Sequence, residues 1–500
     1  MTPPSPDIVI IGSGIGGATL AAALAPSGRR IVILERGERL ADCPEARDPE
    51  AIFARGRFRP DETWRTPGGE AFNPGAYYWV GGASKLYGAV LIRYRAEDFR
   101  PRAHLGGTTP GWPFPYETLE PWYQRAEDLF EVRGDAGQDP TEPPHSGRYP
   151  HPPVPDEPAI AAVRARLRAA GVRPSALPLG IDLARWLDRA PTPWDAFPDT
   201  TGAKRDAESV GLARALAHPN VTLETGARVA RLVAEGDRIA AVDYVQRGET
   251  RRLTPGIVAL AAGAVNSAAL LLASADEARP RGLANRSDQV GRNFMNHNCS
   301  AALAVHPFRP NPSIYQKTLQ VNDFYLTGGP DGAPLGNIQL LGKISGPILA
   351  AASALPRPLA DWIAAHSVDF YVMSEDLPHP DSRVRLERGE IVLDWRRSNW
   401  EAHAALVART RALLRRAGFP VVLTRPFDRR TPSHQCGTAR MGTDPRTSVV
   451  DPFCRSHDHP NLFVADAAIL PTSAAVNPAL TIAANALRAA DHILARDLAP

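Results

Sequence analysis

Short apolar runs, each followed by a helical pattern of small residues, predict the fold at both ends of the chain. Residues 7–36 read DIVIIGSGIGGATLAAALAPSGRRIVILER, which predicts a strand, a glycine-rich turn, a helix and a second strand. Residues 256–272, GIVALAAGAVNSAALLL, predict a buried strand and then a helix. The charge-free run around them is long enough to cross a bilayer, but Gly263, Asn266 and Ser267 interrupt it and favour the strand and helix. An apolar-periodic run from Leu480 to Leu494 predicts a C-terminal helix.

The middle of the chain has a different pattern. Residues 111–130 predict a turn and an amphipathic helix, residues 159–170 a short helix, and residues 220–245 alternating strands around the turn EGDR. From about 295 to 430, β-rich segments alternate with loops and end in a helix at 400–418. This change predicts a second unit with an antiparallel sheet. The proline-rich segment 136–158 predicts a long surface loop.

The first turn carries the clearest motif. In GSGIGG, Gly12 would make the tight turn, Gly14 would let a pyrophosphate approach the backbone, and Gly17 would let the helix pack on the strand. Glu35, at the end of the second strand, could accept a hydrogen bond from a ribose hydroxyl. The arrangement predicts a dinucleotide site but does not separate FAD from NAD.

Two further stretches hold candidate chemistry. Gly81, Gly82 and Ser84 form a second flexible turn, for which an ordinary hairpin is an equal alternative. His434 lies in a loop, where its usual pKa would suit a general base, although a purely structural histidine is the alternative. Asn477 precedes Pro478 at a helix start, so its amide could orient an alkoxide or simply cap the helix.

Composition narrows the function. The formal charge of +3 over 500 residues implies neither nucleic acid nor an anionic membrane as a partner. The four cysteines form no CxxC pair, and we expect no metal site. The cysteine usage and an N-terminus without a cationic leader predict a cytoplasmic location. The loop 374–382, with Glu375 and Asp376, is interpreted as a solvated sheet edge rather than a substrate contact.

The motifs together resemble the glucose-methanol-choline (GMC) oxidoreductases. The likeness is carried by GSGIGG, GGASKLYG, TGARVARL, LAAGAVNSAALL and the C-terminal stretch from SHQCGTARMG onward. It implies an α/β fold (α+β overall), with a Rossmann-like FAD-binding domain from residues 1–40, 77–135, 200–294 and 431–500. A substrate-binding domain would comprise residues 295–430 with the loops 41–76 and 136–199.

The resemblance also implies residue roles. His434 and Asn477 would face the substrate hydroxyl. The FAD-binding residues would be Gly12, Gly14, Gly17, Glu35, Arg36, Gly81, Gly82, Ser84, Val229, Gly263, Asp466, Pro478 and Thr481.

The sequence departs from the family pattern at several positions, among them Leu86, Tyr87 and the pair Ser274-Ala275, where the family usually has Ser-Gly. Leu86 stands where some members carry a histidine linked to FAD, so we expect non-covalent FAD, and Tyr87 stands where many have Asn or His. The expected reaction is oxidation of an alcohol, sugar, glycoside or other polyol by hydride transfer to FAD, with oxygen or another acceptor reoxidising it. The alternative is a redox-neutral or light-driven flavoenzyme of the same fold, of the lyase or decarboxylase type.

Overall fold

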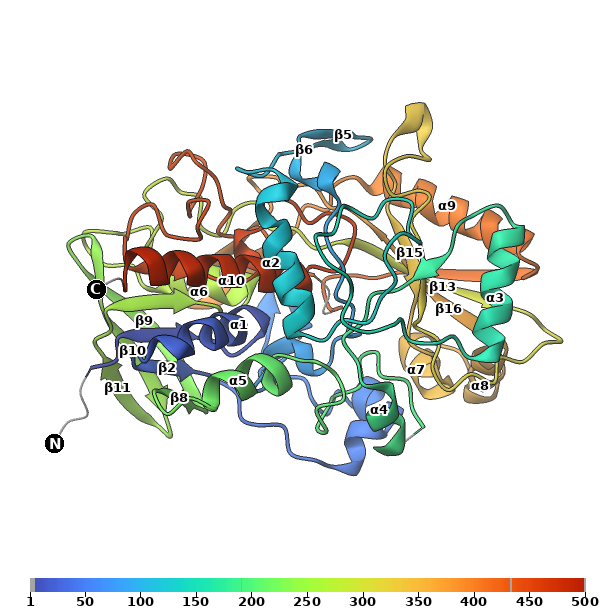
Figure 1. Cartoon of the computed structure of the whole chain (residues 1–500), viewed down its shortest axis with the longest axis horizontal. Helices are drawn as coiled ribbons and strands as arrows, with labels where there is room; N and C mark the ends of the chain where they lie inside the picture. Colours follow the sequence, from blue (N-terminus) through green and yellow to red (C-terminus); the bar gives the residue numbers. More distant parts are fainter. Residues whose placement is uncertain (1–4, 190, 432–433, 499–500) are drawn as a thin grey trace.

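The computed structural model describes residues 5–189, 191–431 and 434–498. A five-stranded parallel sheet forms one end of the molecule (Figure 1). Its strands, in spatial order, are β20 (Leu462–Val464), β12 (Ile257–Leu260), β1 (Ile8–Ile11), β2 (Ile31–Leu34) and β8 (Val221–Glu224). Strands β1 and β12 are buried along their whole length, as expected for a parallel sheet covered on both faces.

Helices cover this sheet and bring the two ends of the chain together. Helix α1 (Ile15–Leu24) packs against α10 (Ala479–Arg496), which also packs against α2 (Tyr116–Leu129). Helix α6 (Ala264–Ala273) follows β12, so residues 256–272 form the predicted strand and helix. Within the described residues, no helix is long and apolar enough to cross a membrane.

The predicted strands at 220–245 divide between two sheets. Strand β8 joins the parallel sheet, whereas β9 (Ala227–Glu235) and β10 (Arg238–Gln246) pair antiparallel with each other. Strand β11 (Glu249–Leu253) completes this smaller sheet.

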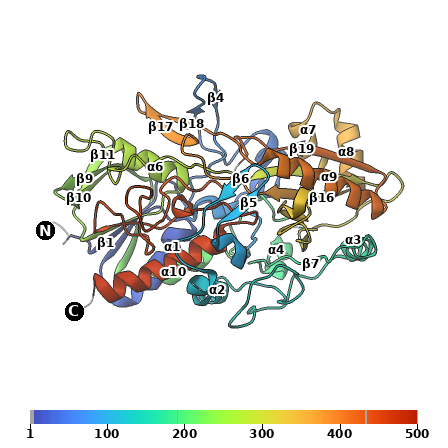
Figure 2. The ribbon, with the colours of Figure 1, turned by 90° about the horizontal axis from the view of Figure 1, so that it is seen from above.

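A six-stranded antiparallel sheet lies at the other end of the molecule (Figures 1 and 2). Its middle strands β13 (Asn298–Val305) and β16 (Ser367–Ser374) are buried throughout, and α9 (Trp400–Arg416) packs on them. The mixed α/β fold with parallel and antiparallel sheets is therefore confirmed. The remaining strands of this sheet are β19 (Val421–Pro426), β15 (Asn337–Leu340), β14 (Leu319–Val321) and β7 (Ser175–Ala176).

Smaller elements connect the two ends. Strands β17 (Arg383–Glu387) and β18 (Glu390–Asp394) join β3 (Trp64–Arg65) and β4 (Ala71–Phe72) in one sheet, and β5 (Arg102–His104) pairs with β6 (Gly107–Thr109). The other helices are α3 (Pro158–Ala169), α4 (Leu183–Arg189), α5 (Ala213–Leu216), α7 (Gly346–Ala352) and α8 (Arg357–His366).

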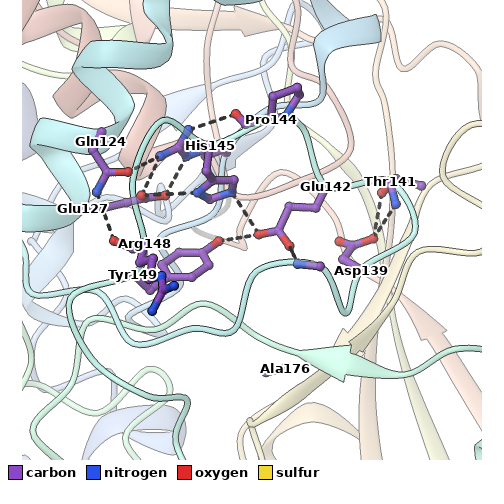
Figure 3. Close-up of polar contacts among 12 residues, drawn as sticks. Gln124, Glu127, Asp139, Thr141, Glu142, Pro144, His145, Arg148, Tyr149 and Ala176 are labelled. Carbon is purple, nitrogen blue, oxygen red and sulfur yellow. Dashed lines mark hydrogen bonds and ion pairs between the residues drawn. The ribbon is translucent and has the colours of Figure 1, made fainter.

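The segment 136–158 lies mostly at the surface, as predicted, yet inward-pointing side chains fasten it (Figure 3). The Glu142 carboxylate lies 3.1 Å from the His145 ring and accepts a hydrogen bond of 2.7 Å from the Tyr149 hydroxyl. Next to them, buried Glu127 on α2 pairs with Arg93 at 2.6 Å. His145 Nδ1 lies 3.8 Å from the Glu127 carboxylate, so the loop contacts α2, the helix that packs against α10.

Candidate functional site

A cavity of about 1410 Å³ lies between the two large sheets. The wall on the side of the parallel sheet is formed by the residues that follow β1, β2, β12 and β20. These residues lie at the carboxyl ends of the parallel strands, where open α/β sheets bind their ligands. The opposite wall, on the side of the antiparallel sheet, includes Leu303 of β13, Tyr371 of β16 and Leu423 of β19. The volume exceeds that of a typical small-molecule pocket and has room for a dinucleotide and a second molecule.

The turn between β1 and α1 needs glycine for several reasons. Gly12 has a φ of +101°, and a Cβ there would lie 2.3 Å from the Ala261 carbonyl oxygen. A Cβ on Gly16 would lie only 1.6 Å from the Ala465 carbonyl oxygen, so Gly16 sets the approach of α1 to the end of β20. Sequence reasoning did not single out Gly16. At Gly14 a Cβ would meet no atom within 4 Å, because the cavity lies there.

Glu35 and Arg36 follow β2 at the cavity wall. The buried Glu35 carboxylate accepts hydrogen bonds from the Ser13 amide (3.0 Å), the Ser13 hydroxyl (2.6 Å) and the Gly37 amide (2.8 Å). Burial raises the pKa of Glu35 despite these bonds. The Arg36 guanidinium lies over the Tyr78 ring, 3.7 Å from its centroid.

The second glycine turn lies directly against the first. Gly81 and Gly82 both have positive φ, +94° and +59°, and a Cβ on Gly82 would lie 3.1 Å from the Gly14 Cα. The Gly81 amide donates to the Ser13 hydroxyl at 3.0 Å. Ser84 donates to the Gly81 carbonyl at 2.6 Å and accepts from the Ala207 amide at 3.0 Å, so its hydroxyl stabilises the turn itself.

The other residues expected to bind the cofactor lie in the second half of the chain or near its middle. Buried Asp466 accepts hydrogen bonds from the Gly263 amide (2.9 Å) and the Ala468 amide (2.7 Å), and burial raises its pKa. Val229, Gly263, Asp466 and Pro478 all line the cavity. Thr481 does not reach the described lining; its hydroxyl shares a 2.7 Å hydrogen bond with Tyr123 on α2. Gly17 and Gly81 also lie outside the described lining.

His434 and Asn477, 43 positions apart, meet at the cavity wall. The Asn477 Nδ2 lies 3.2 Å from the His434 Nε2. Helix α10 begins after Pro478 without a side-chain cap, so the Asn477 amide does not have the capping role that a helix-start asparagine often has. Burial, together with the nearby His297 and Lys317, lowers the pKa of His434 well below its ordinary value.

Sequence reasoning missed two partners of this pair. His297 Nδ1 lies 2.7 Å from His434 Nδ1, and Gln339 Nε2 donates to Asn477 Oδ1 at 3.0 Å. His297 directly precedes β13 and Gln339 lies within β15. Both belong to the 295–430 region, which was predicted only as β-rich, so no sequence signal singled out either residue.

A second missed pair lines the cavity. The Lys317 ammonium pairs with the Asp195 carboxylate at 2.6 Å, and Lys317 is one of the two groups that lower the His434 pKa besides burial. The two residues are 122 positions apart, which gave no sequence signal.

The loop 374–382 differs from its prediction. Glu375 and Asp376 are buried, with exposed fractions of 2% and 1%, so the interpretation of these two as a solvated edge is wrong. Glu375 lies 3.2 Å from the His104 ring, and the Asp376 carboxylate accepts from the Trp395 indole at 2.8 Å. These two carboxylates can be buried because partners from distant segments satisfy them.

The cavity fits a flavin dinucleotide. The open space at Gly14 and the facing Gly82 form a cradle that a Cβ would fill, beside the free N–H groups at the start of α1. Glu35 stands where it could accept from a ribose, although three donors already occupy its carboxylate. Among the described residues, no group of three or more His, Cys, Asp or Glu is arranged to hold a metal ion.

Comparison with known protein families gives three matches. Residues 190–299 and 378–486 match two models of GMC oxidoreductases, and residues 10–58 match an NAD(P)-binding Rossmann-like domain.

Related proteins match over nearly the whole chain. The 6'''-hydroxyparomomycin C oxidase of Streptomyces lividus is 31% identical over 96% of this chain and 90% of its own. The fructose dehydrogenase large subunit of Gluconobacter japonicus is 27% identical over 98% of each chain. The crystal structure of pyridoxine 4-oxidase from Mesorbium loti has the same fold, with a TM-score of 0.71, 22% identity, and 98% and 99% of the two chains covered. The chain therefore belongs to the GMC oxidoreductase family of flavin-dependent enzymes.

Proposed function

We propose that this enzyme binds FAD non-covalently and oxidises the CH–OH group of a sugar, glycoside or other polyol to a carbonyl. The observation that carries the proposal is the contact between His434 Nε2 and Asn477 Nδ2 on the wall of the large cavity. Relatives named as oxidases of paromamine and pyridoxine and as a fructose dehydrogenase support the substrate class. Leu86 on the cavity wall supports non-covalent binding, because it offers no nucleophile at that position.

Two parts of the cavity wall would hold the cofactor. The backbone around Gly14 and Gly82 would hold the pyrophosphate, and Pro478 at the start of α10 would lie next to the ring system. When bound, the flavin supplies the hydride acceptor. The positive end of the α10 dipole would favour negative charge on that acceptor.

His434 would take the hydroxyl proton on Nε2. Burial keeps its pKa low, so the ring is neutral and its lone pair is available at neutral pH. The Asn477 amide would donate to the same oxygen and hold it as negative charge develops. The substrate hydroxyl would thus insert between these two groups, which lie 3.2 Å apart.

The test is anaerobic flavin reduction by a panel of sugars and alcohols. Bleaching of the flavin absorbance by one class would identify the substrate class. His434→Ala should slow this reduction by about 10²–10⁴-fold and Asn477→Ala by about 10²-fold, with FAD retained.

The control is His379→Ala, which removes an exposed histidine from the 374–382 loop and should change nothing. Wild-type reduction rates in both site variants would refute the assigned roles. A flavin that no compound of the panel bleaches would instead favour a redox-neutral or light-driven reaction.

A further inference from the structure

A continuous line of hydrogen bonds passes through the proposed catalytic pair and ends on a backbone carbonyl. Gln339 Nε2 contacts Asn477 Oδ1 at 3.0 Å, and Asn477 Nδ2 contacts His434 Nε2 at 3.2 Å. His434 Nδ1 contacts His297 Nδ1 at 2.7 Å, and His297 Nε2 contacts the Ser473 carbonyl oxygen at 2.7 Å. All four side chains come from different segments of the chain.

The carbonyl fixes the protonation of His297. A carbonyl oxygen only accepts, so His297 Nε2 must carry a hydrogen. Burial lowers the pKa of His297 to about 4, and the ring is therefore neutral at neutral pH and carries one proton. Its Nδ1 is consequently a bare acceptor.

The same reasoning then fixes His434. Two bare nitrogens do not attract each other at 2.7 Å, so His434 Nδ1 must donate to His297 Nδ1. A neutral His434 has no second proton, and its Nε2 is left with a lone pair. The Asn477 amide is consistent with this result, because it donates to Nε2 while its oxygen accepts from Gln339.

We propose that His297 is a positioning residue that holds His434 in its Nδ1–H form and so presents the Nε2 lone pair to the substrate hydroxyl. This inference rests on the proposed function, in which His434 takes the substrate proton. In the other neutral form Nε2 would carry the hydrogen and could not accept that proton. Two histidine nitrogens would also face each other without a proton between them.

The hydrogen bond to His297 is also compatible with a protonated His434. Once Nε2 has taken a proton, the Nδ1–H of His434 still has a neutral acceptor in His297. The buried carboxylate of Glu375 acts electrostatically on His297, since it is one of the groups that raise its pKa against the effect of burial. Glu375 is itself ionised, because hydrogen bonds and charges from His104 and Arg102 overcome burial and lower its pKa to about 2.

Two substitutions separate positioning from packing. In His297→Asn the side-chain oxygen stands near the place of Nδ1 and can still accept from His434, whereas His297→Leu keeps bulk and offers no acceptor. We expect anaerobic flavin reduction within about threefold of wild type for Asn and about 10²-fold slower for Leu, as for other residues that fix a histidine tautomer. The matched control is the same pair of substitutions at His459, a buried histidine whose Nδ1 contacts the Asp237 carbonyl at 3.0 Å; both should leave the rate unchanged.

A second readout does not depend on turnover. Nitrogen-15 spectra of the histidine-labelled holoenzyme, assigned with His434→Gln, should show His434 protonated on Nδ1 and bare on Nε2. The His297→Leu variant should lose this form and His297→Asn should keep it. Because the wild-type spectrum decides the tautomer by itself, the test stands even if the Leu variant does not fold.

The outcomes are distinct. His434 protonated on Nε2 in the wild type, or equal rates in His297→Leu and wild type, would overturn the inference. An equal loss in the Asn and Leu variants would also overturn it, because it would assign His297 a role in packing alone. If His434→Ala reduces flavin at the wild-type rate, the proposed function fails instead.

Discussion

At the scale of single residues, the site consists of groups whose ordinary properties are changed by burial. His434 is half-buried at the cavity wall, with His297 and Lys317 as neighbours, and its protonated form is disfavoured. Asn477 uses its amide on His434 rather than on the helix that follows it. Histidine and asparagine are common side chains. Their partners in this fold leave the proposed roles of proton acceptor to His434 and of hydrogen-bond donor to Asn477.

The lowered pKa of His434 predicts an unusual pH profile. A histidine with the ordinary pKa of about 6.5 would lose its base form as pH falls through that value. Because the protonated form is disfavoured here, the neutral ring should persist, and kcat/KM should stay constant from about pH 8 to about pH 6. The measurement is the pH dependence of kcat/KM with a neutral substrate; an inflection near pH 6.5 would contradict the prediction.

At the scale of elements, the start of α1 joins three parts of the fold. It follows β1, touches the end of β20 through Gly16, and faces the second glycine turn through Gly14. Helix α1 also packs along α10. Asn477 and Pro478 directly precede the first residue of α10. The geometry of the cofactor turn and of the proposed catalytic pair is therefore set by the same packing.

Two glycines of this turn should respond differently to substitution. Gly14→Ala adds a methyl group to open space, so the apoprotein should keep its stability while FAD binds at least about tenfold more weakly. Gly16→Ala places a methyl group 1.6 Å from the Ala465 oxygen and should destabilise the apoprotein by about 1–3 kcal/mol or more. Urea unfolding and FAD titration measure the two effects, and each variant is the control for the other. Equal apoprotein stabilities of the two variants would refute this account of Gly16.

At the scale of the whole molecule, the large cavity separates the parallel sheet from the antiparallel one. The buried cores on the two sides differ: one is built around β1, β12 and α10, and the other around β13, β16 and α9. A ligand that fills the cavity contacts both sides. Such a ligand stabilises the folded state because the unfolded chain does not bind it.

FAD should therefore stabilise both sides of the molecule together. At 100 times its dissociation constant, FAD should add about 2.7 kcal/mol to the free energy of unfolding. Hydrogen exchange should slow both in the turn formed by residues 12–16 and along Leu423–Arg425 of β19, which line opposite walls of the cavity. Protection limited to the 12–16 turn would show that FAD does not couple the two sides.

The sequence alone determined the elements whose signals are local. The run of four apolar residues at 8–11, the glycine turn and the second strand specify one βαβ unit, because strand, turn and helix preferences are set by neighbouring residues. The motifs also specified the family, and they marked His434 and Asn477 as candidates. The sites assigned by resemblance stay predictions until they are measured.

Only the tertiary structure decided what depends on distant partners. It showed Glu375 and Asp376 to be buried, placed β8 in the parallel sheet, and turned Thr481 toward Tyr123. It also brought His297, 137 positions before His434, within hydrogen-bonding distance of it. The burial and the tautomer of a side chain depend on the groups that surround it in the folded protein. These groups come from distant parts of the chain, so the sequence does not show which of them will be neighbours.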